Sequence, residues 1–239
     1  MVISPGTWFI IILAATVLAS ILFKKLTVAG AVTGGVIATA IYSGTQLAGV
    51  IVLAVFFLIG TLTTSWKYDQ KVKLGLAEND HGKRDLFQVL ANGGAAGVIG
   101  LLAFFFPFHS RSLFIILASS LSAAAADTTS SELGSLYGRK FFNIISFSID
   151  QRGENGVVSA EGSLAGLMAS TLVAIVAALL RDLGFGSILI IIISGTFGNV
   201  ADSVAGAVLE RKGLTGNNTV NMINTITGAL TALIILAAA

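Results

Sequence analysis

Long apolar runs separated by short polar stretches make up most of the chain. A helix needs about 20 apolar residues to cross a hydrocarbon core of about 30 Å, with some latitude for tilt. Eight runs approach or exceed this length, and each is predicted to be a membrane-spanning helix. The predicted spans are residues 7–23, 27–44, 46–66, 85–106, 112–135, 158–180, 184–208 and 218–238. The second run is Gly-rich and short enough to be re-entrant, so a count of seven spans is the alternative.

The composition supports an all-α membrane protein. Of the 239 residues, 55% are hydrophobic and 11% are charged, and the mean hydropathy is +0.91, well above that of soluble domains. No linker or soluble segment interrupts the pattern, so we predict a polytopic helix bundle in which residues 1–239 form a single transmembrane domain. The absence of cysteine excludes disulfides, thiolate metal sites and cysteine nucleophiles.

The basic residues divide unevenly between the two sets of loops that eight spans create. Arg111 and Arg181 fall in one set, and the other twelve Lys and Arg residues fall in the opposite set. By the positive-inside rule, the lysine-rich loops face the cytoplasm and both termini face outside. Eleven of the twelve Asp and Glu residues lie on the same side as the twelve basic residues, in the loops or at the adjoining helix ends. The positive-inside rule does not require this. We therefore expect a functional face on the cytoplasmic side of a prokaryotic cell membrane.

Polar side chains recur at helical spacing where the predicted spans meet this face. The sets that share one helix face are Asp85, Gln88 and Asn92; Asp127 and Ser131; Asn199, Asp202 and Gly206; and Asn217, Asn221 and Asn224. Glu161 begins a further span among small residues. Glu132 lies about 140° around the helix from Asp127, so it joins that face only if the helix ends or kinks near "SSELG". Helix packing through small residues and hydrogen bonds between helices are the structural alternatives for the glycines and amides.

The carboxylates are harder to explain by packing alone. An ionised side chain inside a span costs about 2.5 to 3.5 kcal/mol or more, and Asp85, Asp127, Glu161 and Asp202 come from four different helices. Carboxylates gathered together repel one another unless a cation lies among them. With oxygen ligands only, Mg²⁺ is the expected ion, shared with substrate phosphates. Salt bridges to Lys83, Arg84 or Arg139 are the main alternative.

Enzymes of phosphoryl or nucleotidyl transfer typically combine carboxylates that bind a metal ion with basic residues and Gly-rich helix N-termini that bind phosphate oxygens. The predicted cytoplasmic face contains all of these. The chain has no GxxxxGK[ST] phosphate loop, so a nucleotide site would be of another design. An ion-coupled transporter is the competing class. The position of the polar groups towards one surface disfavours it.

Five motifs, "KRDLFQVLANGG", "AADTTSSELG", "VVSAEGSLAG", "GNVADSVAGAVLE" and "NNTVN", occur in this order. They resemble the integral-membrane family, once catalogued as a domain of unknown function, that includes plant phytyl-phosphate kinase and vertebrate transmembrane protein 19. The resemblance implies a kinase that converts an isoprenoid monophosphate to the diphosphate with a nucleoside triphosphate, CTP or ATP. A fainter similarity to membrane cytidylyltransferases and polyprenol kinases, which use Mg²⁺, supplies the alternative of a polyprenol kinase or lipid cytidylyltransferase.

The combined hypothesis gives these residues roles. Asp127, Glu132, Glu161 and Asp202 would bind Mg²⁺, and Asp85 would act as a base if the acceptor were an alcohol. Phosphate or ligand binding is assigned to Lys83, Arg84, Asn92, Ser131, Arg139, Lys140, Ser163, Arg211, Lys212, Asn218 and Asn221. The expected partners are the nucleoside triphosphate, an isoprenoid monophosphate lipid and the membrane, and nothing in the sequence resembles a nucleic-acid-binding module. The oligomeric state, with a homodimer as one option, is left open.

Overall fold

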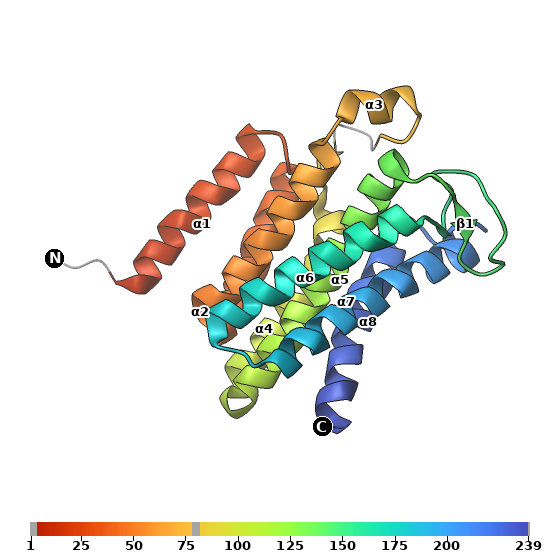
Figure 1. Cartoon of the computed structure of the whole chain (residues 1–239). Coiled ribbons are helices and arrows are strands. Elements are labelled where there is room, and N and C mark those ends of the chain that lie inside the picture. The colour runs from red at the N-terminus through yellow and green to blue at the C-terminus, as the bar shows by residue number, and fades with distance from the viewer. Residues whose placement is uncertain (1–3, 78–81, 239) are drawn as a thin grey trace.

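The computed structural model describes residues 4–77 and 82–238, and helices dominate it (Figure 1). The helices are α1 Pro5–Leu22, α2 Val28–Ser65, α3 Tyr68–Lys73, α4 Leu86–Phe105, α5 Ser110–Tyr137, α6 Ala160–Arg181, α7 Phe185–Ala205 and α8 Asn217–Ala238. A 3₁₀ turn, η2 (Pro107–His109), precedes α5, and a π-helical turn, η3 (Gly206–Glu210), extends α7. Two short strands, β1 (Phe142–Asn143) and β2 (Val157–Val158), form an antiparallel hairpin between α5 and α6. The expected all-α membrane bundle is confirmed.

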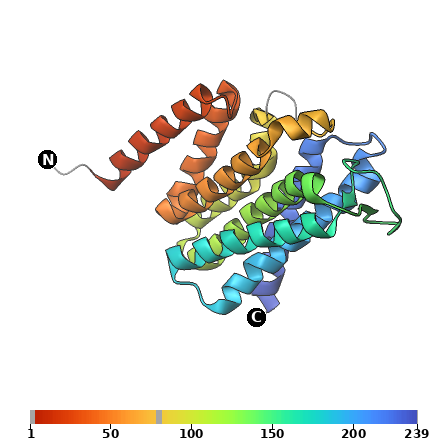
Figure 2. The same cartoon turned by 45° about the horizontal axis from the view of Figure 1, so that its top comes forward.

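Helix α2 is a hairpin of two helical segments. Gln46 has φ 56° and ψ −153°, which no helical residue adopts. Gly30 and Gly60 both lie against Arg84, although a straight helix would separate them by about 45 Å. The two halves of α2 therefore run antiparallel, as Figure 2 shows. They correspond to the predicted spans 27–44 and 46–66.

Six helices in the described part of the chain are long and apolar enough to cross a membrane. They are α2, α4, α5 with η2, α6, α7 with η3, and α8; the apolar stretch of α1, Gly6–Leu22, is shorter. The count of eight crossings stays a prediction. It would be met if α1 and both halves of α2 each crossed.

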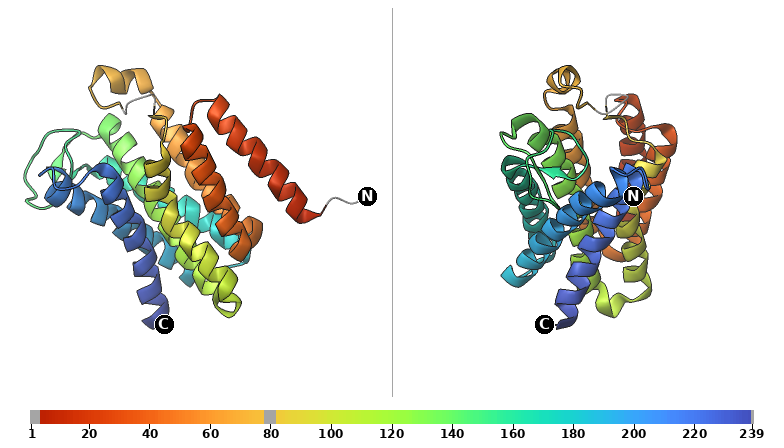
Figure 3. Two further views of the ribbon diagram at one scale, coloured as in Figure 1. Left: turned by 180° about the vertical axis from the view of Figure 1, so that it is seen from behind. Right: turned by 90° about the vertical axis from the view of Figure 1, so that its right-hand side faces the viewer.

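Helix α5 is the core of the bundle. In its apolar stretch 83% of the residues are buried, against 28% to 39% in the other five long helices. It packs on α2, α4, α6, α7 and α8 (Figure 3). Its run from Ala118 to Ala126, which is Ala and Ser apart from Leu121, allows this, because small side chains let neighbouring backbones approach closely.

Glycines mark the crossing of α5 and α6. A Cβ on Gly162 would lie 2.7 Å from the Ser130 carbonyl oxygen and 2.9 Å from the Gly134 Cα. The neighbouring Gly166 lies equally close to the Ala126 carbonyl. The small-residue spacing in this helix therefore serves helix packing, which was the structural explanation considered for the glycines.

Gly162→Ala is expected to lower the free energy of unfolding by about 1 to 3 kcal/mol, because the added methyl group forces two backbones apart. The matched control is Gly94→Ala in α4, where the added Cβ would meet no atom within 4 Å apart from the adjoining backbone of its own helix. That change should be neutral or stabilising, because Ala favours a helix by about 1 kcal/mol over Gly. Thermal unfolding of the purified variants in detergent measures both. Equal shifts in melting temperature would contradict the close crossing.

The basic loops gather at one end of the bundle. We call this the polar end; it consists of residues 23–27, 66–77, 82–85, 138–159 and 211–216 (Figure 1). Both described ends of the chain lie away from it. At the opposite end the Arg111 guanidinium donates to the Asp182 carbonyl at 3.1 Å, and the Arg181 guanidinium donates to the Thr45 carbonyl at 2.8 Å. The predicted partition of the charges is therefore present in the fold, while the side of the membrane that each end faces stays a prediction.

Candidate functional site

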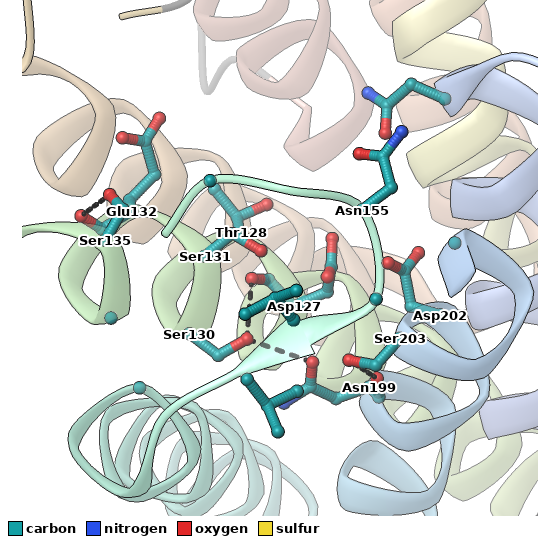
Figure 4. Close-up of a pocket in the computed structure, with 18 of the residues that line it drawn as sticks. Asp127, Thr128, Ser130, Ser131, Glu132, Ser135, Asn155, Asn199, Asp202 and Ser203 are labelled. Carbon is teal, nitrogen blue, oxygen red and sulfur yellow. Dashed lines mark hydrogen bonds between the residues drawn. The ribbon is translucent and has the colours of Figure 1, made fainter. Parts of the chain in front are cut away.

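A cavity of about 460 Å³ opens at the polar end, between helices α4 to α8 and the β1–β2 hairpin (Figure 4). Hydroxyl, amide and carboxyl side chains line its helical walls. Phe141, Ile144, Val157 and Val158 of the hairpin line another part. The cavity is therefore polar towards the bundle and partly apolar towards the hairpin.

Four of the predicted helix faces meet in this cavity. The residues that line it are Gln88 and Asn92 of α4, Asp127 and Ser131 of α5, Asn199 and Asp202 of α7 with Gly206 at its end, and Asn217 and Asn221 of α8. Ser163 of α6 adds a fifth helix, as predicted. Asn224 lies one turn deeper, fully buried, with its Nδ2 donating to the Ala123 carbonyl at 3.3 Å. The convergence expected from helical spacing is therefore observed for these residues.

Asp127 and Asp202 form a carboxylate pair across α5 and α7. Their carboxyl groups are near enough to interact electrostatically, and Asp127 is only 8% exposed. The Oδ1 atom of Asp202 is buried and accepts no hydrogen bond. Ser130 donates to the Asn199 side-chain oxygen at 3.0 Å beside the pair, which ties the same two helices together (Figure 4). Two acids held this close indicate a site for a positively charged group.

Glu210 is an acidic neighbour that the sequence hypothesis did not include. It lines the cavity and acts electrostatically on Asp202. The π-helical turn places it there: the Arg211 amide donates to the Gly206 carbonyl at 2.9 Å, five residues back. Gly156 of the hairpin fits against this turn, where a Cβ would lie 2.3 Å from the Ala207 Cβ. Such turns are frequent at functional sites, but helical spacing in the sequence gives no sign of them.

Glu132 is directed to a different partner. Helix α5 continues unbroken through "SSELG" to Tyr137, so the break that would turn Glu132 towards Asp127 does not occur. Glu132 instead forms an ion pair with Lys71 of α3, whose side chain is 1% exposed. The Lys71 ammonium also donates to the carbonyls of Thr63 at 2.7 Å and Thr64 at 3.1 Å, at the end of α2. Glu132 therefore lies at the cavity edge, already paired with a buried cation.

The other two predicted carboxylates have local roles. Asp85 is the N-cap of α4: it accepts from the Gln88 amide at 2.9 Å, and the Gln88 side chain accepts from the Asp85 amide. The Glu161 carboxylate accepts a long hydrogen bond of 3.4 Å from the backbone N–H of Arg139. Neither residue lines the cavity. Within residues 4–77 and 82–238 no three acidic or histidine side chains are grouped for a metal, so the four-carboxylate set is reduced to Asp127 and Asp202.

Most of the predicted basic ligands lie outside the cavity. Arg84 lines it, with its guanidinium 5.7 Å from the centre of the Phe56 ring and close to Gly60. Arg211 donates to both Asp150 oxygens, at 2.5 and 3.2 Å, and holds the pKa of Asp150 below its usual range. The predicted residues that do not line the cavity are Lys83, Arg139, Lys140, Arg211, Lys212 and Asn218. Asn217 takes the place expected of Asn218, because it lies four residues before Asn221 and so shares its face.

Comparison with known proteins identifies the family. The profile described as integral membrane protein DUF92 matches residues 11–229. An uncharacterized membrane protein of Methanocaldococcus jannaschii is 36% identical over 188 residues, which cover 77% of this chain and 75% of that protein. Protein VTE6 of Arabidopsis thaliana, a chloroplastic protein, is 31% identical over 193 residues, covering 78% of this chain and 58% of VTE6. No solved structure matches the chain. The chain therefore belongs to the DUF92 family of integral membrane proteins.

Proposed function

We propose that the protein is an isoprenoid-monophosphate kinase, which transfers the terminal phosphoryl group of CTP or ATP to a lipid phosphate and forms the diphosphate. The observation that carries the proposal is the Asp127–Asp202 pair, with Asp127 buried and Asp202 half-buried, in a polar cavity at one end of a membrane bundle. The resemblance of the sequence motifs to the family that includes plant phytyl-phosphate kinase supports a lipid phosphate as the acceptor, and the chain's membership of an integral-membrane family is consistent with it. In this proposal the polar end faces the cytoplasm, where nucleoside triphosphates are found.

A phosphate monoester as acceptor needs no general base, so both carboxylates are available to bind a metal ion. A phosphate monoester is largely doubly ionised at neutral pH, because its second pKa is about 6. An oxygen of the acceptor phosphate forms a bond to the terminal phosphorus of the donor. The bond from that phosphorus to the bridging oxygen breaks, and the nucleoside diphosphate leaves. No proton has to be removed from the acceptor, so neither Asp127 nor Asp202 is needed as a base.

The donor set fits Mg²⁺. This ion is usually held by one or two carboxylates, waters and substrate phosphates, which two aspartates can provide. Asp202 has a buried Oδ1 without a hydrogen-bond partner, and so does Asn92. When bound, Mg²⁺ supplies positive charge that neutralises the donor phosphates. Asp127 and Asp202 would hold it, in place of the four carboxylates expected from the sequence.

The charge of the cavity also favours a metal-bound nucleotide. Asp127, Glu132, Glu154, Asp202 and Glu210 line the cavity, and Arg84 is the one basic side chain among its described lining residues. A polyphosphate entering alone would be repelled by Asp127, Asp202 and Glu210, whereas the charge of Glu132 is compensated by Lys71. Arg84 would bind phosphate oxygens by charge-assisted hydrogen bonds, and the side chains of Asn92, Asn221 and Ser131 would orient them.

A direct assay tests the function. Purified protein in detergent is offered labelled CTP or ATP with phytyl, geranylgeranyl or farnesyl monophosphate. We expect a labelled lipid diphosphate, formed with Mg²⁺ and absent with EDTA. A cytidylylated lipid with release of pyrophosphate would instead establish the cytidylyltransferase alternative. Uptake of substrate into sealed vesicles without nucleotide consumption would establish a transporter.

A further inference from the structure

The cavity reaches the outer surface of the bundle between α6 and α7. Ser163 of α6 and Val200 of α7 both line the cavity and are both exposed, Val200 by 46%. Leu167, four residues after Ser163, and Phe197, three before Val200, are exposed without lining the cavity. These faces of α6 and α7 therefore point out of the bundle. On membrane-spanning helices, they point towards lipid chains.

Close helix contact limits this opening on its deeper side. A Cβ on Gly166 would lie 2.9 Å from the Asn199 Nδ2, and one turn deeper the Ser170 hydroxyl donates to the Ile192 carbonyl at 3.3 Å. The opening is therefore confined to the first turn of α6 and the last turns of α7. We call it the lateral window, defined by Ser163, Gly166, Asn199 and Val200.

The lateral window adjoins the apolar side of the cavity, which the hairpin lines. On the α4 and α8 side the lining side chains are the amides Gln88, Asn92, Asn217 and Asn221. On the window side the lining includes Val200 and, from the strand that leads into α6, Val157 and Val158. A bound molecule with a charged head and an apolar tail would therefore direct its tail to α6 and α7.

The hairpin next to the window has a surface suited to lipid. Phe142, Ile145, Phe147 and Ile149 are exposed by 36% to 81%, in a segment outside the membrane-length helices. A cluster of large exposed apolar side chains on a loop is typical of a surface that contacts a membrane or a partner. Here the same loop supplies cavity-lining residues and continues into α6.

We infer that the isoprenoid tail of the acceptor passes from the cavity into the bilayer through the lateral window, so that Val200 and Ser163 determine which tails are accepted. The inference rests on the proposed function for the identity of the acceptor. It adds a route for the tail and two residues that select chain length. The phosphate head stays beside Asp127 and Asp202, while the tail lies against Val200 and then Phe197.

Val200→Trp and Ser163→Trp test the route through chain-length selectivity. Each variant is assayed with dimethylallyl monophosphate and geranylgeranyl monophosphate, and the ratio of kcat/KM for the long over the short acceptor is compared with that of the unchanged protein. We expect the ratio to fall about tenfold, because an indole ring in the window obstructs only the long tail. The matched control is Val98→Trp in α4, a 59% exposed valine that does not line the cavity. An unchanged ratio in both window variants would overturn the inference.

Photo-crosslinking tests the same route without turnover. The full chain is mixed with a geranylgeranyl monophosphate that carries a diazirine in the isoprene unit next to the phosphate, irradiated, and digested for mass spectrometry. We expect label in residues 160–168 or 197–208 that excess unlabelled geranylgeranyl monophosphate displaces. Displaceable label confined to α1 or α4, or label at the window that is not displaced, would overturn the inference. If the protein phosphorylates no acceptor, the kinase proposal fails while this measurement still decides the route.

Discussion

Asp127→Asn is expected to lower the rate of phosphoryl transfer by about a thousandfold without unfolding the protein. A metal-binding carboxylate contributes several kcal/mol to charge stabilisation in the transition state, and about 4 kcal/mol corresponds to this factor. Asp202→Asn should have a similar effect, because its carboxyl group lines the same cavity and interacts electrostatically with that of Asp127. Turnover of labelled nucleotide over a range of Mg²⁺ concentrations measures the loss.

Stability measurements separate this role from a structural one. Replacing one of two neighbouring carboxylates removes electrostatic repulsion between them, so the melting temperature of the Asp127→Asn protein without Mg²⁺ should be unchanged or higher. Mg²⁺ should raise the melting temperature of the unchanged protein and not that of the variant, because an ion that binds only the folded state stabilises it. The matched control is Asp182→Asn, the same substitution in the loop at the opposite end of the bundle. Near-normal Mg²⁺-dependent turnover of the Asp127→Asn protein would show the assignment to be wrong.

Helical spacing predicted much of the site, because positions within one helix are related by a fixed rotation. Asp127 with Ser131, and Asn199 with Asp202, share a face in any helix that contains them, and the structure brings both faces to the cavity. The uneven distribution of Lys and Arg then predicted that these faces meet at one end. The same register placed Asn217 on the face of Asn221, and Asn217 lines the cavity, whereas Asn218, which was assigned to ligand binding outside that register, does not.

Partners across long stretches of sequence could not be predicted in this way. Lys71 pairs with Glu132 and Arg211 with Asp150, each 61 residues apart. Loop geometry decides which acid a basic side chain reaches, and no periodicity encodes loop geometry. Lys71 was counted among the topology-determining residues, and Arg211 was expected to bind phosphate. The π-helical turn that places Glu210 could not be predicted either, because it interrupts the 3.6-residue helical period on which the prediction relied.

Glu132→Gln is expected to lower the free energy of unfolding by about 3 kcal/mol, a large effect on stability where that of Asp127→Asn is on activity. Lys71 is almost completely buried, and the change leaves its charge without the carboxylate that compensates it. The double variant Lys71→Met with Glu132→Gln should recover most of the loss, because no buried charge remains. Glu154→Gln is the matched control: Glu154 is 47% exposed and lies 3.9 Å from Arg211, so its loss should cost less than about 1 kcal/mol. Chemical unfolding of the purified proteins in detergent measures all three.

The same variants decide between two roles for Glu132. If Glu132 holds α3 against α5 and the end of α2, as its contact with Lys71 indicates, Glu132→Gln loses stability and the double variant regains both stability and turnover. If Glu132 is instead a metal ligand, as its place in "SSELG" first suggested, the double variant regains stability but remains inactive, because the carboxylate is still missing. Stability that does not change in Glu132→Gln would contradict the buried ion pair. Comparison with Asp127→Asn, for which we expect lost turnover and retained stability, then distinguishes a residue that holds the cavity in shape from one that acts within it.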